Sequence, residues 1–223
     1  MFNFQKIKKT FLIAEAGVNH EGDIKEAMKL VDIAKKSGAD AVKFQTYLTD
    51  YYVASSEKER FKRVKKFELT FSDFKKISNY CKKKKIIFVS TPLDNQSVDF
   101  LYDFVPFFKI SSGDITNHDL LVKIASKNKP ILLSTGGANL KEIRKAINLI
   151  ETNTKIDSSK YLALMHCVPL YPVPSKEANL RNILTLRKHF KNIIGYSDHT
   201  KGYEAAIVAV TLGANIIEKH FTF

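Results

Sequence analysis

The C-terminal stretch Ile193–Phe223 decides the fold, and it reads IIGYSDHTKGYEAAIVAVTLGANIIEKHFTF. Two short apolar runs, each ending in a histidine, flank one run that is rich in alanine and valine. This pattern predicts a strand, a helix and a second strand parallel to the first. His199 ends the first strand and His220 the second. Because neighbouring parallel strands lie about 4.8 Å apart, both imidazoles are predicted at the same edge of one sheet.

The rest of the chain repeats this alternation of strand and helix. Near-continuous apolar runs are typical of parallel strands that are buried on both faces. The sequence therefore predicts eight strands and seven helices, as in an α/β (β/α)8 TIM barrel that lacks its eighth helix. An open doubly wound sheet is the alternative fold. The six strands that precede the last two are predicted at residues 11–18, 40–47, 86–92, 107–113, 130–137 and 161–168.

Capping residues mark where several of the helices begin. Asp23 precedes one helix, with Glu26 as its capping-box partner, and Thr70 and Asn139 begin two others. The polar segment 48–68 has no clear apolar period, and it is interpreted as a long loop after the second strand.

Composition favours one soluble domain over residues 1–223. The chain has 223 residues, 44% of them hydrophobic, and no apolar run approaches the roughly 20 residues that span a bilayer. The N-terminal residues lack the features of a signal peptide. Two cysteines, Cys81 and Cys167, give no disulfide framework, so we expect a reducing cytoplasm.

The formal charge of +13 is concentrated in lysine runs such as 82–85, at helix ends and turns. Such runs are typical of solvated faces, and no nucleic-acid-reading motif accompanies them. A nucleic-acid-binding barrel is the alternative, and steeply salt-dependent affinity would reveal it. The charge also favours an anionic substrate by electrostatic steering.

Three charged residues interrupt the apolar strands. Glu15, Lys43 and Lys109 each occur in an otherwise apolar run, where an unpaired charge is unfavourable. They are either structural ion pairs inside the barrel or functional groups, two lysines facing an anion and one carboxylate acting on a substrate. In barrels of this class the active site lies at the carboxyl ends of the strands, which favours the functional interpretation.

Hydroxyl and glycine residues follow several of the strands. SSGD at Ser111–Asp114 and STGG at Ser134–Gly137 place hydroxyls and close-approaching backbone N–H groups at strand ends, where they could bind phosphate oxygens. Together with the two lysines, they favour a phosphorylated or carboxylated substrate.

Histidines also gather at the predicted strand ends. His199 and His220 are either two core histidines or a metal site with open positions, and imidazole suits Mn, Fe, Co or Zn. Cys167 could instead be a nucleophile beside His166. Neighbours in one strand point to opposite faces, which argues against that pairing.

Taken together, these stretches resemble the N-acetylneuraminate (sialic acid) synthase family, in collinear order over nearly the whole chain. The stretches that carry the resemblance are IAEAGVNHEG (13–22), GADAVKFQTY (38–47), FVSTP (88–92), KISSGD (109–114), LSTG (133–136), His166–Cys167 with Tyr171–Pro172, GYSDHT (195–200) and EKHFT (218–222).

The resemblance implies a transferase that condenses phosphoenolpyruvate with an open-chain N-acylated aminosugar such as N-acetylmannosamine, releasing phosphate. His199 and His220 would hold a divalent ion, expected to be Mn²⁺, with Mg²⁺ or Co²⁺ as the alternatives. Glu15 would handle protons or position water. Phosphoenolpyruvate would be held by Lys43, Thr91, Lys109, Ser112, Ser134 and Ser197, and the sugar would be contacted by Gln45, Asp114 and Tyr171.

Two departures from the family pattern concern the phosphate site and the C-terminus. Pro169 stands where sialic acid synthases carry an asparagine, so one phosphate contact is lost. The expected antifreeze-like domain, which in the family reaches a partner subunit in a homodimer, does not follow Phe223 in this sequence. The alternatives are a legionaminate or pseudaminate synthase, and a catalytically incomplete barrel that binds ligand without turnover. No membrane partner is expected.

Overall fold

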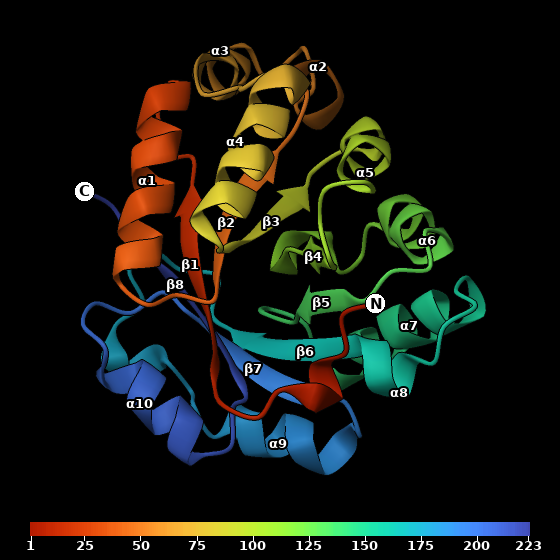
Figure 1. The fold of residues 1–223 in the computed structure, drawn as a ribbon. Helices are drawn as coiled ribbons and strands as arrows, with labels where there is room; N and C mark the ends of the chain where they lie inside the picture. The colour runs from red at the N-terminus through yellow and green to blue at the C-terminus, as the bar shows by residue number, and fades with distance from the viewer. The chain divides into compact units, whose positions relative to one another are not determined.

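The computed structural model describes residues 1–223 and follows the predicted alternation (Figure 1). All eight predicted strands form. They are β1 (Phe11–Gly17), β2 (Ala41–Thr46), β3 (Ile87–Pro92), β4 (Phe108–Ile110), β5 (Ile131–Ser134), β6 (Leu162–Cys167), β7 (Ile193–Asp198) and β8 (Ile216–His220). β4 and β5 are shorter than predicted, because the hydroxyl and glycine residues that follow them leave the ladder; Ser112–Asp114 forms the 3-10 turn η2.

Seven helices connect successive strands, and no helix follows β8. These are α1 (Ile24–Lys36), α4 (Phe71–Lys84), α5 (Asn95–Leu101), α6 (His118–Ser126), α7 (Leu140–Thr152), α9 (Asn182–His189) and α10 (Glu204–Thr211). Short additional elements are α2 (Thr49–Tyr52), α3 (Lys58–Lys66), α8 (Ser158–Tyr161), η1 (Phe4–Lys6) and η3 (Ser175–Glu177). None of the helices combines the length and apolar character needed to cross a bilayer.

The strand order settles the fold class. The eight strands form one sheet in the order β3-β2-β1-β8-β7-β6-β5-β4, and the β2/β3, β4/β5, β5/β6, β6/β7 and β7/β8 pairs are parallel. Strands that are consecutive in sequence are neighbours, except β3 and β4, which are the first and last strands of this order, and β1 lies beside β8. This is the order of a (β/α)8 barrel, because a doubly wound sheet would place strands out of sequential order. The doubly wound alternative is therefore wrong.

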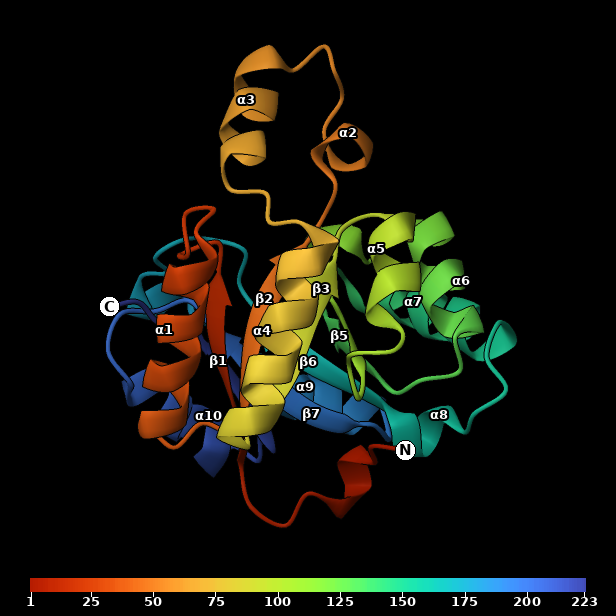
Figure 2. The same cartoon turned by 45° about the horizontal axis from the view of Figure 1, so that its top comes forward.

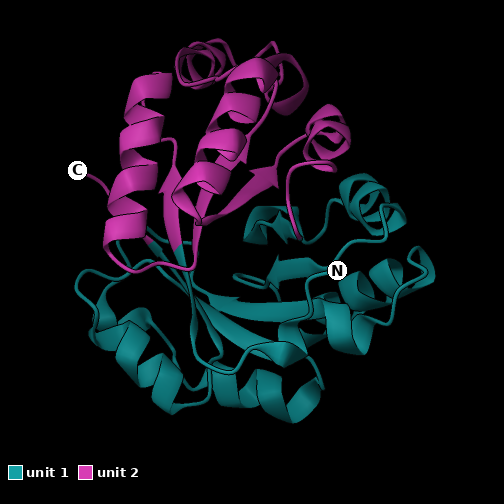
Figure 3. Ribbon diagram, viewed as in Figure 1, with its two compact units in different colours: residues 1–13, 107–219 teal, residues 14–106, 220–223 magenta.

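The chain divides into two compact units, and each is described by itself below (Figure 3). Unit 1 comprises residues 1–13 and 107–219, and unit 2 comprises residues 14–106 and 220–223.

An aromatic cluster anchors the N-terminal residues within unit 1. The ring of Phe107 lies 4.9 Å from that of Phe2 and 5.3 Å from that of Phe4, between ring centroids. The Gln5 side-chain amide donates to the backbone carbonyl of Ser159 at 2.8 Å, which ties this segment to α8. The residues before β1 thus cover one end of the unit 1 core.

Segment 48–68 in unit 2 is not the loop that the sequence predicts. It forms α2 and α3, which extend away from α4 and β2 in Figure 2. No residue of α3 is buried, so the helix has no apolar stripe that a periodic pattern could reveal. Polar contacts hold it instead: the Tyr47 hydroxyl donates to the Val64 carbonyl at 3.1 Å, and the backbone N–H of Thr49 donates to Glu68 at 2.8 Å.

Gly22 allows the loop after β1 to pack against the end of α3. Its φ of +83° favours glycine, and an added Cβ would lie 2.5 Å from the carbonyl oxygen of Lys66. Any side chain at this position would displace the α2–α3 segment.

Capping residues begin the helices largely where the sequence places them. Asn139 forms a capping box with Glu142, and Thr70 forms one with Asp73. Asp23 caps α1 through the N–H of Lys25, but the predicted capping box with Glu26 is wrong. The Glu26 carboxylate pairs instead with Lys29, one turn further along the helix, at 2.6 Å.

We expect Thr70→Ala to lower the free energy of unfolding by about 1 kcal/mol at pH 7. The hydrogen bond from the Thr70 hydroxyl is the main cause that lowers the pKa of Asp73 below its ordinary value. A carboxylate with a lowered folded-state pKa stabilises the fold above its unfolded pKa and loses that contribution as the pH falls through the folded value. The difference between variant and wild type should therefore shrink in acid. Urea unfolding at several pH values measures it, with exposed Ser72→Ala as the control that should change nothing.

Candidate active site

Unit 1 assembles a buried charged group around Lys109. The ammonium of Lys109 donates to the Ser134 hydroxyl at 2.8 Å and lies 3.5 Å from a carboxylate oxygen of Glu218. The same Glu218 oxygen accepts from the Ser197 hydroxyl at 2.8 Å. Residues from β4, β5, β7 and β8 thus meet, and three of the four are predicted phosphoenolpyruvate contacts.

Of the four residues in this group, only Glu218 is missing from the site residues predicted from the sequence. It interrupts the apolar start of β8 in the same way that Glu15 interrupts β1, and it stands two residues before His220. Strand alternation places residues two apart on the same face. The sequence therefore contained a signal for Glu218 as a site residue, but it did not show which lysine is the partner of Glu218.

His199 has the hydrogen bonding of a neutral imidazole. Its Nδ1 lies 2.8 Å from the carbonyl oxygen of Val168, so Nδ1 carries the proton and Nε2 the lone pair. Burial lowers the pKa of His199. The Tyr171 ring stacks on the imidazole, with ring centroids 4.0 Å apart. A backbone carbonyl that orients a histidine in this way is typical of metal ligands.

Cys167 and His166 point to opposite faces of β6. The Cys167 sulfur lies 3.8 Å from Nδ1 of His199, whereas Nε2 of His166 donates to the Ala178 carbonyl at 2.8 Å. Burial raises the pKa of the Cys167 thiol, so it stays protonated at neutral pH. A Cys167–His166 nucleophile pair, disfavoured from the sequence, is not formed.

Two further predicted residues lie on the turn after β4. The Ser112 hydroxyl accepts from the backbone N–H of Gly136 at 3.0 Å, which links the ends of β4 and β5. An added Cβ on Gly136 would lie 2.8 Å from this hydroxyl, so the contact requires glycine. The carboxylate of Asp114 accepts from the Ser111 hydroxyl.

Asp198 fixes the backbone that follows His199. Its buried carboxylate accepts from the Thr200 N–H at 2.8 Å and from the Thr200 hydroxyl at 2.7 Å. Lys219 lies 2.7 Å from the other oxygen and also donates to the Thr200 carbonyl at 2.8 Å. The pair therefore ties the end of β8 to the residue after His199.

We expect Asp198→Asn to lower the free energy of unfolding by about 2 kcal/mol, because it leaves the Lys219 ammonium without its counter-charge. Urea unfolding of this variant, of Lys219→Met and of the double variant gives the coupling energy between the two side chains. If the losses in unfolding free energy of the two single variants simply add in the double variant, the Asp198–Lys219 interaction does not contribute to stability.

Unit 2 assembles a second buried ion pair. The Lys43 ammonium lies 2.7 Å from a carboxylate oxygen of Glu15 and donates to the Thr91 hydroxyl at 3.0 Å. These residues come from β2, β1 and β3, and all three side chains are buried. The sequence offered ion pairs and functional groups as alternatives, and the structure shows that both lysines have carboxylate partners.

His220 and Gln45 are the remaining predicted residues of unit 2. The His220 ring lies beside Gly17, where an added Cβ would be 3.7 Å from the ring carbon Cε1. The backbone N–H of Phe221 donates to the Glu15 carbonyl at 3.2 Å, and the Asn19 amide donates to the Phe221 carbonyl at 2.8 Å. Gln45 is half-buried in β2, two residues after Lys43.

His20, another strand-end histidine, belongs to the core of unit 2. Its Nδ1 accepts from the Gly22 N–H at 3.1 Å, its ring is buried beside Phe44, and burial lowers its pKa to about 4. The predicted metal site names only His199 and His220 and stays a prediction; the structure contains no group of three or more His, Cys, Asp or Glu side chains that could hold an ion.

Comparison with known proteins identifies the family. A sequence profile of the NeuB family matches residues 30–223. The chain belongs to the NeuB family. It is 44% identical over 230 residues to N,N'-diacetyllegionaminic acid synthase of Campylobacter jejuni, covering 97% of this chain and 68% of that protein. It is 34% identical over 233 residues to pseudaminic acid synthase of the same species, covering 98% and 67%.

A solved NeuB-family relative shares the fold. The crystal structure of N-acetylneuraminic acid (sialic acid) synthetase from Leptospira borgpetersenii, in complex with citrate, superimposes with a TM-score of 0.90 and 38% identity, over 96% of this chain and 74% of that one. The chain spans 59–68% of the length of the curated relatives it matches.

Proposed function

We propose that this NeuB-family chain carries the barrel of a nonulosonic acid synthase. It would condense phosphoenolpyruvate with an open-chain N-acylated aminosugar such as N-acetylmannosamine and with water, and it would release phosphate. The observation that carries the proposal is the buried Lys109, held between the Ser134 hydroxyl and the Glu218 carboxylate at the strand ends. A buried ammonium with hydroxyls around it is suited to an anionic substrate.

The proposed phosphoenolpyruvate contacts form one group of residues in each unit, and each group is described by itself. Lys109 donates a hydrogen bond to the Ser134 hydroxyl, and the Ser197 hydroxyl donates one to Glu218. A phosphate or carboxylate oxygen could replace either acceptor. Lys43 and Thr91 offer the equivalent pair in unit 2, and Ser112 contributes a further hydroxyl. Pro169 has neither an N–H nor a side-chain amide, so it contributes no phosphate contact.

His199 and His220 would hold a divalent ion, for which we propose Mn²⁺. The neutral imidazole of His199, with Nδ1–H bonded to the Val168 carbonyl, fits such a ligand. When bound, the ion would act as a Lewis acid on the aldehyde oxygen of the sugar.

The atoms of the proposed reaction balance as follows. The C3 carbon of phosphoenolpyruvate forms a bond to the aldehyde carbon, and the aldehyde oxygen takes a proton. Water adds at C2 and phosphate leaves, which gives the 2-keto acid. Glu15, paired with Lys43 at 2.7 Å, would hold the water or take its proton. Gln45, Asp114 and Tyr171 would contact the sugar.

The relatives do not identify which aminosugar is the substrate. Legionaminate and pseudaminate synthases are the second candidates, since both names occur among the relatives. A barrel that binds without turnover is the non-enzymatic candidate. The free cysteines, both buried, support a reducing cytoplasm. A homodimer is the assembly that we propose.

Phosphate release from phosphoenolpyruvate, followed with Mn²⁺ and a panel of N-acylated aminosugars, tests the proposal. The synthase predicts release that requires one sugar of the panel and stops with a chelator. Phosphoenolpyruvate binding without release, at any sugar concentration, would favour the barrel that only binds.

A further inference from the structure

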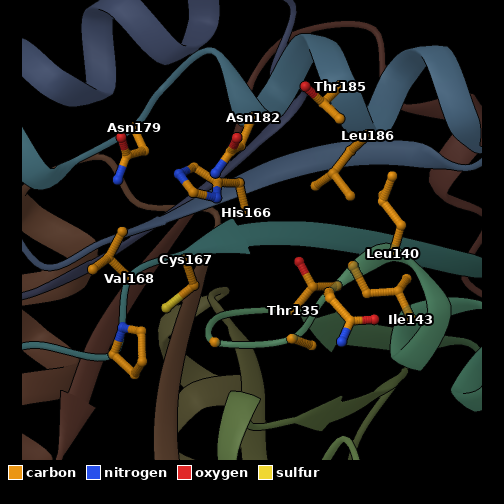
Figure 4. A pocket seen from close by; sticks show the side chains of 14 residues that line it. Thr135, Leu140, Ile143, His166, Cys167, Val168, Asn179, Asn182, Thr185 and Leu186 are labelled. Atoms are coloured by element: carbon orange, nitrogen blue, oxygen red, sulfur yellow. The ribbon is translucent and has the colours of Figure 1, made fainter.

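Unit 1 also contains a pocket, called the second pocket, that is not lined by any member of the charged group around Lys109. Figure 4 shows the side chains that line it. Its volume is about 580 Å³, within the range of roughly 300–1,000 Å³ that small-molecule sites occupy. It is lined by the carboxyl ends of β5 and β6 together with residues of α7 and α9. Thr135 and His166 line it, and so do Cys167 and Val168 at the end of β6. The pocket therefore lies between these strand ends and the helices α7 and α9.

His166 provides a fixed hydrogen-bond acceptor in this pocket. The side chain is 5% exposed, and its Nε2–H donates to the Ala178 carbonyl at 2.8 Å. The ring also stacks on Tyr196, with ring centroids 5.6 Å apart. Nδ1 therefore carries the lone pair, and no group in the structure donates to it. Burial lowers the pKa of His166, which keeps this nitrogen an acceptor at neutral pH.

Neighbouring side chains add donors and acceptors that have no partner of their own. Asn182 points toward His166 in Figure 4, and neither its amide nor the Thr185 hydroxyl is engaged in a hydrogen bond in the structure. Asn179 uses its amide N–H on the Glu177 carbonyl at 2.9 Å, which leaves its side-chain oxygen available.

The remaining wall of the pocket is apolar and the lining is uncharged. Leu140, Ile143 and Leu186 form the side away from His166 in Figure 4. No Lys, Arg, Asp or Glu lines the pocket, although the chain has a net charge of +13. A phosphate or carboxylate would find no counter-charge here, in contrast to the group around Lys109. The lining therefore favours an uncharged ligand.

We propose that this pocket is a second binding site for an uncharged N-acylated aminosugar. The acylamino group of such a sugar matches the lining: its N–H donates to Nδ1 of His166, its carbonyl accepts from the Asn182 amide, and its methyl packs against the leucine and isoleucine side chains. The sugar hydroxyls bind Asn179 and Thr185. The choice of sugar class rests on the proposed function, whereas the size, neutrality and donor pattern come from the pocket itself.

The pocket shares a wall with the active site. Val168 and Cys167 line it, and the Val168 carbonyl orients His199 at 2.8 Å while the Cys167 sulfur contacts the same ring. A ligand packed against Val168 would restrict the segment that holds His199. Occupancy of the second site should therefore act on the active site through His199, and turnover should rise more steeply with sugar concentration than a single site allows.

Titration of the methyl-labelled chain with N-acetylmannosamine, followed by NMR, tests the site. We expect the methyl resonances of Ile143, Val168 and Leu186 to shift together. Asn182→Leu should weaken this binding about tenfold or more, because the donor to the acyl carbonyl is lost. Asn148→Leu, at an exposed position of α7 outside the pocket, is the matched control and should bind like wild type. Mannose, which lacks the acylamino group, should bind more weakly by a similar factor.

Several results would overturn the assignment. These are the absence of shifts in the wild type, equal binding by Asn182→Leu, and shifts at the same methyl groups with inorganic phosphate in place of the sugar. The readout is independent of catalysis. A chain that releases no phosphate but shows the pocket shifts would refute the proposed function alone, and normal turnover without the shifts would refute the second site alone.

Discussion

His199→Ala is expected to lower Mn²⁺-dependent turnover by at least about 10³-fold, which corresponds to roughly 4 kcal/mol of transition-state stabilisation. The substitution removes the imidazole whose Nδ1–H is bonded to the Val168 carbonyl and whose Nε2 is the proposed metal ligand. The fold should survive, because the neighbouring Asp198 and Thr200 contacts do not involve the imidazole. Phosphate release at saturating phosphoenolpyruvate measures the loss, and Mn²⁺ binding by electron paramagnetic resonance measures the ligand role without turnover.

The matched control for this variant is His189→Ala. His189 lies at the exposed end of α9, and its Nδ1 lies 3.4 Å from the Arg144 guanidinium. It should retain wild-type turnover and Mn²⁺ affinity. Unchanged Mn²⁺ affinity in His199→Ala would remove His199 from the metal site, and we expect the same loss for His220→Ala.

Lys109→Met is expected to raise the Michaelis constant for phosphoenolpyruvate by about thirtyfold or more, because a charge-assisted hydrogen bond contributes roughly 2 kcal/mol. Methionine retains most of the buried volume but not the ammonium that donates to Ser134. Steady-state kinetics with phosphoenolpyruvate varied at saturating sugar measure the effect. Lys141→Met, at an exposed position of α7, is the control that should behave like wild type.

The Lys109→Met variant leaves the buried Glu218 carboxylate without the nearby Lys109 ammonium, although Glu218 still accepts a hydrogen bond from the Ser197 hydroxyl. A loss of activity in this variant could therefore come from a folding defect. A double variant, Lys109→Met with Glu218→Gln, removes both charges and separates a folding defect from lost substrate binding. If the folded double variant binds phosphoenolpyruvate as tightly as wild type, the anion site is elsewhere.

The sequence predicted the strands and the charged residues within them because both leave local signals. Buried parallel strands appear in the sequence as apolar runs, so a lysine at position 43 or 109 is easily recognised as an exception. The resemblance to the sialic acid synthase family covers both positions. Which carboxylate pairs with which lysine depends on strand register and on contacts between segments far apart in sequence. For that reason the Glu218 partner of Lys109 had to come from the structure.

Elements stabilised by polar contacts were the least predictable. α3 has no buried face and is held through contacts such as the Tyr47 hydroxyl on the Val64 carbonyl, so hydrophobic periodicity gave no signal. The Asp23–Glu26 capping box failed for a related reason, because Glu26 has a nearer partner in Lys29. The second pocket lies between α7, α9 and two strand ends, and no single stretch of sequence encodes it.

The central claim is that the strand-end site joins phosphoenolpyruvate to an N-acylated aminosugar. The most direct test is mass spectrometry of the products after incubating the chain with both substrates and Mn²⁺. The account predicts a new acid whose mass equals that of the sugar plus pyruvic acid, formed together with one equivalent of phosphate and formed more slowly by Lys109→Met when phosphoenolpyruvate is below saturation. Phosphate released together with free pyruvate, and no carbon–carbon bond formed with any aminosugar, would contradict it.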